Sequence, residues 1–203
     1  MNPDIKHNIQ SLLDTQQRQI LGIVGAPGAG KSTLVAQIVE QFGSQVVVLP
    51  MDGFHLADAE LRRLGRDQRK GAPDTFDAAG FVSLLSRVRH QTDEVIYAPE
   101  FDRSLGAAIA GSIAIAPETP LVIVEGNYLL LQTGEWRHVR PLLDVSWYVD
   151  VDEALRVSRL IERHVQFGRT PEAARAWVMM SDEPNARLIE ECKPLADWLL
   201  PWV

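Results

Sequence analysis

The segment that most restricts the fold is a glycine-rich run, Gly25-Ala26-Pro27-Gly28-Ala29-Gly30-Lys31-Ser32. It matches the pattern GxxxxGK[ST] at every fixed position. An apolar run typical of a strand precedes it, and apolar residues at helical spacing follow it. A strand, a glycine-rich turn and a helix in this order are typical of one unit of a parallel α/β sheet.

The same run, a P-loop, predicts a phosphate site, because glycines let successive N–H groups point inward and the helix N-terminus adds a favourable dipole. Residues 25–32 together with Thr33 are therefore the candidate ATP site. Lys31 is expected to reach the β and γ phosphates, and Ser32 to bind Mg²⁺. The alternative is a glycine-rich turn without a ligand, which the correct flanks on both sides disfavour. The motif indicates the nucleotide but leaves the reaction open.

Strand and helix patterns alternate along the rest of the chain. This alternation favours a doubly wound, mostly parallel sheet with helices on both faces, a three-layer α/β/α fold. The length of 203 residues fits a single domain, residues 1–203. Strands are expected at 19–25, 46–50, 95–98, 112–116, 121–125 and 145–150, and helices near 9–13, at 31–42 and 78–90, from Asp152 to Phe167, and from Thr170 onward.

Composition and charge exclude several classes of protein. The formal net charge is -7, and the one basic cluster, Arg62 to Lys70, is interrupted by Asp67, which argues against a nucleic-acid partner. Five histidines and one cysteine, Cys192, do not form a spaced zinc site. No apolar run approaches the roughly 20 residues that span a bilayer. The expectation is a cytoplasmic protein, monomer or homodimer, that acts on a small molecule without a membrane partner.

A second apolar run, Leu121-Val122-Ile123-Val124, ends in Glu125. An acid at the end of a buried strand is the Walker B pattern, so Glu125 is expected to hold Mg²⁺ opposite Ser32. The alternative is an acid that merely ends a strand at the surface.

Two other classes of P-loop protein are disfavoured by missing motifs. Neither an Asn-Lys-x-Asp guanine reader nor a Leu-Ser-Gly-Gly signature is present in the sequence, which disfavours a GTPase and a transporter ATPase.

A third apolar run, residues 46–50, breaks into Met51-Asp52-Gly53-Phe54-His55. Polar groups at the carboxyl end of a parallel strand face the ligand crevice. Asp52 is a candidate general base, because an alcohol is a poor nucleophile and a nearby carboxylate can align it and accept its proton. Asp52 is also a candidate outer-sphere Mg²⁺ ligand, while Asp-Gly alone is a common turn. His55 either binds a substrate hydroxyl or is simply packed.

With these segments, the sequence resembles the phosphoribulokinase/uridine kinase family of P-loop kinases, which includes bacterial pantothenate kinases. The resemblance rests on the P-loop, MDGFHL, VIVEGNYLL, RKGAPDTFD, YAPEFDR and the arginine-rich stretch around residues 159–169. It covers residues 20–190 and is closest to the branch labelled fructose transport system kinases, which shares MDGFHL, KGAPDTFD and SDEPNARLIE.

The resemblance implies roles for several residues. In this family the acid at the position of Asp52 takes the proton from the substrate hydroxyl. Arginines matching Arg159, Arg163 and Arg169 form a lid, here about 156–180, that closes over ATP and neutralises the transferred phosphoryl group. The alternative is a solvated basic face that pairs with Glu153 and Glu162.

Two segments depart from the patterns of the nucleoside and pantothenate kinases of the family. Nucleosides and pantothenate are therefore kept only as alternative acceptors. The run Gly71 to Asp77 lacks the family's Asp-His-Pro, and Pro99-Glu100-Phe101-Asp102-Arg103 has no histidine after it. Polar and charged groups suit a polyhydroxylated or anionic acceptor such as a fructose-like sugar. Two other classes stay open, an ATP-binding regulatory module of a transport system and an ATPase. The candidate acceptor-binding residues are Asp52, His55, Asp74, Phe101, Asp102 and Arg103.

Overall fold

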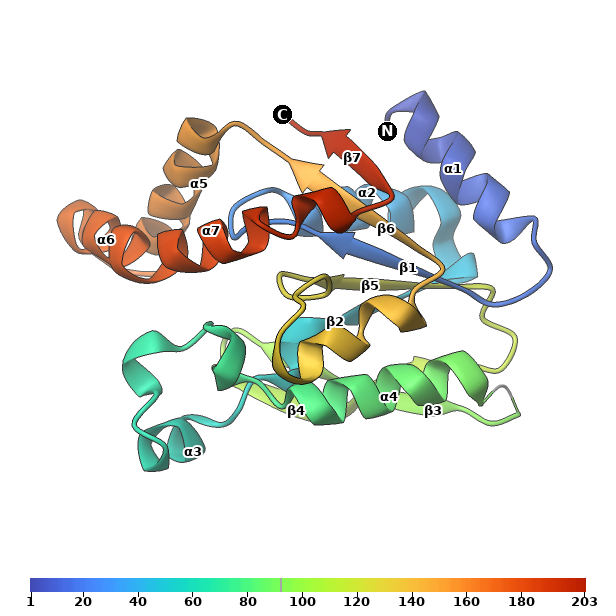
Figure 1. The fold of residues 1–203 in the computed structure, drawn as a ribbon, viewed down its shortest axis with the longest axis horizontal. Helices are drawn as coiled ribbons and strands as arrows, with labels where there is room; N and C mark the ends of the chain where they lie inside the picture. The colour runs from blue at the N-terminus through green and yellow to red at the C-terminus, as the bar shows by residue number, and fades with distance from the viewer. Residues whose placement is uncertain (92) are drawn as a thin grey trace.

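The computed structural model describes residues 1–91 and 93–203, and within them five strands form one parallel sheet (Figure 1). Its order places β1 in the centre, so that the chain crosses over to both sides of the first strand. The order is β2 (Val46–Pro50), β5 (Leu121–Gly126), β1 (Gln19–Val24), β6 (Val145–Asp150) and β7 (Trp198–Pro201).

Alternate residues of β1 face opposite layers of helix. Ile20 and Val24 belong to a core cluster that includes Phe81 of α4, whereas Leu21 and Ile23 belong to a second cluster with Leu34 of α2. All these residues are fully buried. The predicted three-layer, doubly wound α/β/α fold is therefore confirmed. The helices are α1 (Pro3–Leu13), α2 (Lys31–Phe42), α3 (Asp58–Arg63), α4 (Ala78–His90), α5 (Glu153–Gln166), α6 (Pro171–Trp177) and α7 (Glu183–Glu190).

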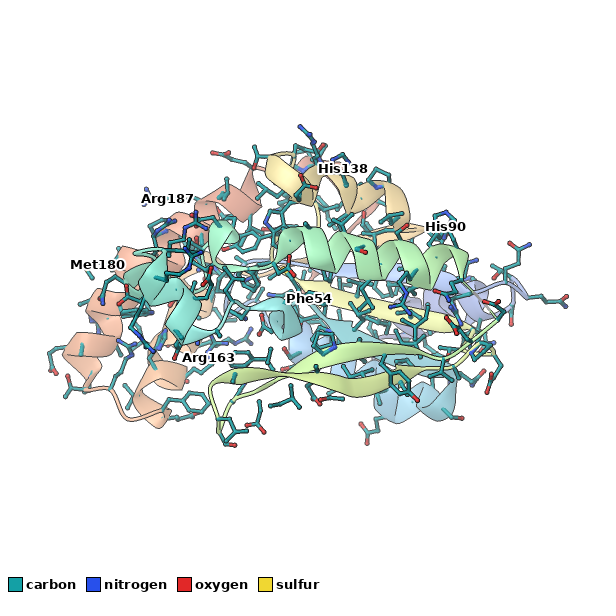
Figure 2. All side chains as sticks on the ribbon, turned by 90° about the horizontal axis from the view of Figure 1, so that it is seen from below. Phe54, His90, His138, Arg163, Met180 and Arg187 are labelled. Carbon is teal, nitrogen blue, oxygen red and sulfur yellow. The ribbon has the colours of Figure 1, made fainter. Side chains whose placement is uncertain are left out.

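An antiparallel hairpin lies beside the sheet and consists of β3 (Ile96–Asp102) and β4 (Ala107–Ile115). Both strands are longer than predicted, so that most of YAPEFDR is strand. The sequence of β4 is rich in alanine and lacks a clear apolar alternation, so it gives a weak strand signal. Phe54 lies between the hairpin and α4 (Figure 2), with its ring 5.1 Å from that of Phe81.

The helices after β6 begin as predicted. The Asp152 carboxylate accepts a hydrogen bond from the N–H of Leu155 at 3.0 Å, and the Thr170 hydroxyl accepts one from Ala173 at 3.2 Å. A π-helical turn, Val178–Asp182, joins α6 to α7. The sequence did not predict α3, α7 or β7. In the described part of the chain, no helix combines the length and apolar character that crossing a membrane requires.

Candidate active site

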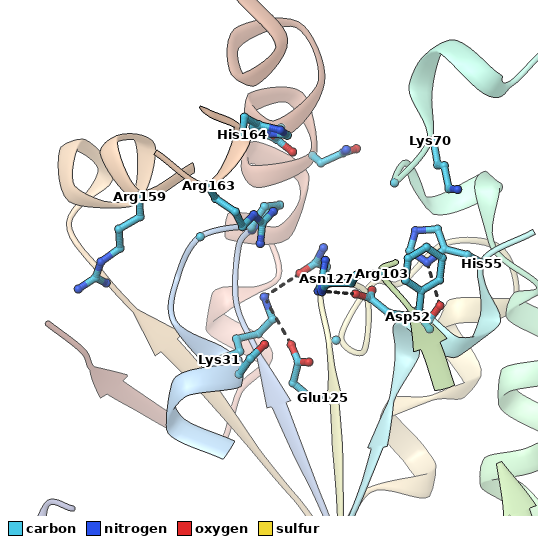
Figure 3. Close-up of a pocket in the computed structure, with 18 of the residues that line it drawn as sticks. Lys31, Asp52, His55, Lys70, Arg103, Glu125, Asn127, Arg159, Arg163 and His164 are labelled. Atoms are coloured by element: carbon cyan, nitrogen blue, oxygen red, sulfur yellow. Dashed lines mark hydrogen bonds and ion pairs between the residues drawn. The ribbon is translucent and has the colours of Figure 1, made fainter. Parts of the chain in front are cut away.

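A cavity of about 510 Å³ opens at the carboxyl ends of the central strands (Figure 3). Parallel strands all end at the same edge of the sheet, so the loops that follow β1, β2 and β5 meet there. The lining contains most of the predicted site residues: Pro27, Gly28, Gly30, Lys31, Ser32, Thr33, Asp52, His55, Phe101, Arg103, Glu125, Arg159, Arg163 and Arg169. Of the predicted P-loop residues, Gly25, Ala26 and Ala29 are not part of this lining.

The phosphate loop needs glycine at two positions. Gly28 and Gly30 have φ values of 81° and 92°, which other residues rarely adopt. A Cβ at Gly28 would also lie 2.7 Å from Cγ of Leu160, because α5 packs on the loop. Gly30 precedes α2 and provides no side-chain cap. The first-turn N–H groups of α2 are therefore available to an anion in the cavity.

Lys31 is buried at the base of this cavity. Its ammonium donates to the carbonyls of Gly25 at 2.9 Å and Ala26 at 3.2 Å, and to Oδ1 of Asn127 at 2.8 Å. These bonds use all three N–H donors of the ammonium. Burial lowers the pKa of Lys31, and the carboxylate of Glu125, 3.8 Å away, opposes that shift. Asn127 was not predicted, although it lies only two residues beyond Glu125.

The two predicted acids lie on neighbouring strands. Pro50 of β2 is in register with Glu125 of β5, which brings Asp52, two residues further along, to the same edge of the sheet. Burial raises the pKa of Glu125, while Lys31 acts in the opposite direction. Asp52 does belong to a turn, Met51–Phe54, as the alternative held, yet its carboxylate still lines the cavity.

His55 combines the two alternatives that the sequence left open, since it is packed and also lines the cavity. Its ring lies 4.0 Å from that of Phe76 and 5.0 Å from that of Phe101. Nδ1 is 2.9 Å from the carbonyl oxygen of Asp52, so a protonated Nδ1 donates there and Nε2 remains an acceptor. Burial lowers the pKa of His55.

Asp74 and Asp102 do not lie in the cavity lining, in contrast to the prediction. The carboxylate of Asp74 instead binds the guanidinium of Arg69 at 2.5 Å. Oδ1 of Asp102 accepts hydrogen bonds from the N–H groups of Ser104 at 2.8 Å and Leu105 at 3.0 Å, which holds the turn of the hairpin. Local partners therefore take both carboxylates away from an acceptor.

The three predicted lid arginines line the cavity but differ in direction. The guanidinium of Arg163 points toward Lys31, whereas that of Arg159 points away from it (Figure 3). Arg169 stacks on Trp177, with Cζ 4.1 Å from the ring centre. Within residues 1–91 and 93–203, no carboxylate of Glu153 or Glu162 lies within 4 Å of these guanidinium nitrogens, so the alternative of a paired basic face is not supported.

Contacts between α5 and the following segment hold this part of the site together. Nε2 of His164 is 2.9 Å from Oδ2 of Asp182, and Arg156 forms a buried ion pair with Glu183 at 2.8 Å. Asp182 and Asn185 also line the cavity, and both belong to the SDEPNARLIE pattern, to which the sequence assigned no role. Lys70, within RKGAPDTFD, is a further lining residue that was missed.

A nucleotide held by the loop after β1 would present its terminal phosphate to the acid that follows β2. This is the arrangement of a P-loop kinase that acts on a small metabolite, since a switch protein has no need of an acid and a lined cavity beyond the phosphate. The chain belongs to the phosphoribulokinase/uridine kinase family, whose model matches residues 20–203. The protein is accordingly an ATP-dependent small-molecule kinase.

Individual relatives agree with this assignment. A Schizosaccharomyces pombe protein named "putative uridine kinase" is 37% identical over 191 residues, which cover 89% of this chain and 81% of that protein. The crystal structure of a "putative fructose transport system kinase" from Silicibacter sp. TM1040 is 39% identical, covers 98% of both chains and has a TM-score of 0.89. YFH7 from Saccharomyces cerevisiae, 19% identical with a TM-score of 0.81, covers 98% of both chains and shares the fold.

Proposed function

We propose that the protein transfers the γ-phosphate of ATP to a hydroxyl group of a small polyhydroxylated metabolite, with a fructose-like sugar as the first candidate. The observation that carries the proposal is the position of Asp52. Its carboxylate opens into the same cavity as Lys31 and Glu125, on the side lined by His55 and Phe101, which we take as the acceptor chamber.

The proposed step requires one base and no covalent intermediate. The acceptor oxygen attacks the γ-phosphorus and forms a new O–P bond, while the bond from that phosphorus to the bridging oxygen breaks. The electron pair of the broken bond leaves with ADP, and the acceptor proton passes to the carboxylate of Asp52. A base of this kind contributes about 10²- to 10⁴-fold in rate.

The residues present fit a magnesium ion. Mg²⁺ prefers oxygen ligands and is usually held by one or two carboxylates together with substrate phosphates. The hydroxyl of Ser32 and the carboxylates of Glu125 and Asp52 are the candidate donors, and all three residues line the cavity. The ion would neutralise charge on the β and γ phosphates.

The lid arginines support transfer rather than hydrolysis. Arg163, together with Arg169 and Arg159, lies on the segment after β6, and closure of this segment would exclude water from the phosphoryl group. Guanidinium groups match the charge that spreads over the three phosphoryl oxygens. We assign the segment 156–180 as this lid within a single kinase domain.

The acceptor chamber favours a small, polar compound. The aromatic rings of Phe76 and Phe101 flank His55, whose Nε2 can accept a hydrogen bond from a hydroxyl. A relative named for uridine makes nucleosides an alternative acceptor, and a solved neighbour is named for fructose transport. Pantothenate is the other alternative, from the family resemblance of the sequence. Departures from the nucleoside pattern at 71–77 and 99–103 favour the sugar.

A panel of acceptors tests the reaction directly, with ADP release as the readout. Sugars, sugar phosphates, nucleosides and pantothenate are each supplied with ATP and Mg²⁺. A kinase releases ADP only when its acceptor is present. Release without any acceptor would indicate an ATPase, and no release in any condition would indicate an ATP-binding regulatory module of a transport system.

Replacement of the base tests its role. With Asp52→Asn, turnover should fall by about 10²- to 10⁴-fold, while ATP binding, measured by calorimetry, changes little. Asp67→Asn is the matched control, because Asp67 is exposed and its carboxylate bonds only to Gln68 in the described residues. Near-normal turnover of the Asp52 variant would contradict the assignment.

A further inference from the structure

Arg103 leaves the backbone where β3 ends and reaches back over the cavity. The turn it begins is held by Asp102, whose carboxylate accepts from the N–H groups of Ser104 and Leu105. The guanidinium of Arg103 lies 3.5 Å from Oδ2 of Asp52, and its side chain is 58% exposed. A charge-assisted N–H···O bond is usually about 2.7–2.9 Å long, so the contact with Asp52 is loose.

Arg163 approaches the same space from the opposite wall. In the described part of the chain, no carboxylate lies within 4 Å of its guanidinium nitrogens. Figure 3 shows the side chains of Arg103 and Arg163 both directed into the space in front of the ammonium of Lys31. Burial lowers the pKa of Arg163, and repulsion from Arg103 lowers it further.

Three converging cations are unfavourable unless an anion lies between them. Three acids of the lining, Asp182, Asp52 and Glu125, oppose the shift in the pKa of Arg163. Asp182 is held by His164, whose Nε2 is 2.9 Å from its Oδ2. Asp52 and Glu125 are needed for the proton and for Mg²⁺ in the proposed function. A phosphoryl group in transfer carries charge on three equatorial oxygens, and two planar guanidinium forks from opposite sides can each bind part of it.

We infer that Arg103 and Arg163 form a two-sided clamp on the phosphoryl group in transfer, so that Arg103 is a catalytic residue and not an anchor for the acceptor. The inference rests on the proposed function and adds a residue to it. In the structure the guanidinium of Arg103 lies 3.5 Å from Oδ2 of Asp52. A phosphoryl group in transfer would draw Arg103 to itself and leave the carboxylate of Asp52 available to the acceptor hydroxyl. Through Arg103, which follows β3 of the hairpin, the availability of the base Asp52 thereby depends on the bound nucleotide.

The test does not depend on the identity of the acceptor. The probe is Mg²⁺·ADP with aluminium fluoride, an analogue of the planar phosphoryl group, and its affinity is measured by calorimetry beside that of Mg²⁺·ADP alone. Arg103→Gln should weaken binding of the analogue at least tenfold and leave ADP binding within about twofold. The reason is that Arg103 contacts only the γ-phosphoryl position, which aluminium fluoride fills and which ADP lacks. Arg103→Lys keeps the positive charge but lacks the planar guanidinium, so its loss of affinity for the analogue should be intermediate.

Two controls make the result specific. Arg137→Gln removes an exposed arginine that is not part of the cavity lining and should bind the analogue as the wild type does. A double-mutant cycle with Arg163→Gln should show coupling between the two arginines, since both bind one group. Unchanged far-ultraviolet circular dichroism of Arg103→Gln excludes misfolding as the cause of a weaker affinity.

Opposite outcomes separate the two proposals. If Arg103→Gln binds the analogue as tightly as the wild type, the clamp is wrong while the kinase function stands. If the wild type binds the analogue no better than ADP, the site does not stabilise a transferring phosphoryl group, and the proposed function fails with the clamp. With an acceptor from the panel, the clamp predicts a lower kcat at constant acceptor KM, and a raised KM at constant kcat overturns it.

Discussion

The ion pair between Arg156 and Glu183 connects α5, which contains the start of the proposed lid segment, to α7. Only 2% of the Arg156 side chain and 6% of the Glu183 side chain are exposed. Nη2 of Arg156 is 2.8 Å from Oε1 of Glu183, and Nε and Nη1 of Arg156 have no hydrogen-bond partner in the described residues. The guanidinium thus depends on a single carboxylate.

Glu183→Gln should cost about 3–5 kcal/mol of unfolding free energy, because it leaves an uncompensated charge in a buried place. Domains of this kind are stable by about 5–15 kcal/mol, so the loss is large enough to measure by urea denaturation. ATP affinity should also fall, since the carbonyl of Arg156 lies only 2.9 Å from where a Cβ of Gly28 would be. The P-loop therefore follows any shift of α5.

Two comparison variants isolate the cause. Replacing both partners together, Arg156→Met with Glu183→Leu, removes the charge and should recover most of the stability. Glu60→Gln removes a carboxylate from an exposed pair with Arg63 and should leave the midpoint of denaturation unchanged. A loss below about 1 kcal/mol in Glu183→Gln would refute the reasoning, because the guanidinium would then be hydrated in place.

Two further predictions concern the P-loop and the acceptor chamber. Gly28→Ala should lower the free energy of unfolding by about 2–5 kcal/mol, because its φ is positive and the new Cβ would contact Leu160. Gly43→Ala, with a φ of 55° and open space around it, should lower it by only about 1–2 kcal/mol. Equal losses in urea denaturation would show that the contact is absent. Burial lowers the pKa of His55 below its ordinary value of 6.5, so the unfolded chain takes up the proton first as the pH falls. The contribution of His55 to stability is therefore present above pH 6.5 and is lost below it. An NMR titration of the His55 ring should have its midpoint below 6.5, and a midpoint at or above that value would contradict the effect of burial.

Much of the site could be predicted because its key residues follow from local patterns. Asp52 and Glu125 lie at or just beyond the carboxyl ends of apolar runs, and parallel strands end at one edge. Lys31 is fixed by the glycine-rich motif and begins the helix that follows it. The position of Asp74 outside the cavity lining could not be predicted, because a carboxylate in a polar segment gives no sign of its partner. Its partner, Arg69, lies five residues earlier in the same segment.

The role of the hairpin could not be predicted from local pattern. Arg103 meets Asp52 only because β3 packs against the turn after β2, where the carbonyl of Pro99 lies so close that a Cβ at Gly53 would collide with it. This contact joins residues about fifty positions apart, and neither segment carries a periodic signal for it. The contact between Asn127 and Lys31 could not be predicted for the same reason, since these residues are far apart in the sequence. The amide oxygen of Asn127 accepts the third hydrogen bond of the Lys31 ammonium.

By itself, the sequence determined the layered α/β fold, the phosphate loop and the two acids, because backbone conformation, apolar periodicity and the shared edge of a parallel sheet are local or repetitive properties. The tertiary structure decided which charges are neutralised and which remain available. Asp74 and Asp102 are satisfied by neighbours, while Arg103 and Arg163 converge from separate elements on one point in front of Lys31. Charge pairing depends on distances of a few ångströms, and those distances exist only once the elements have packed.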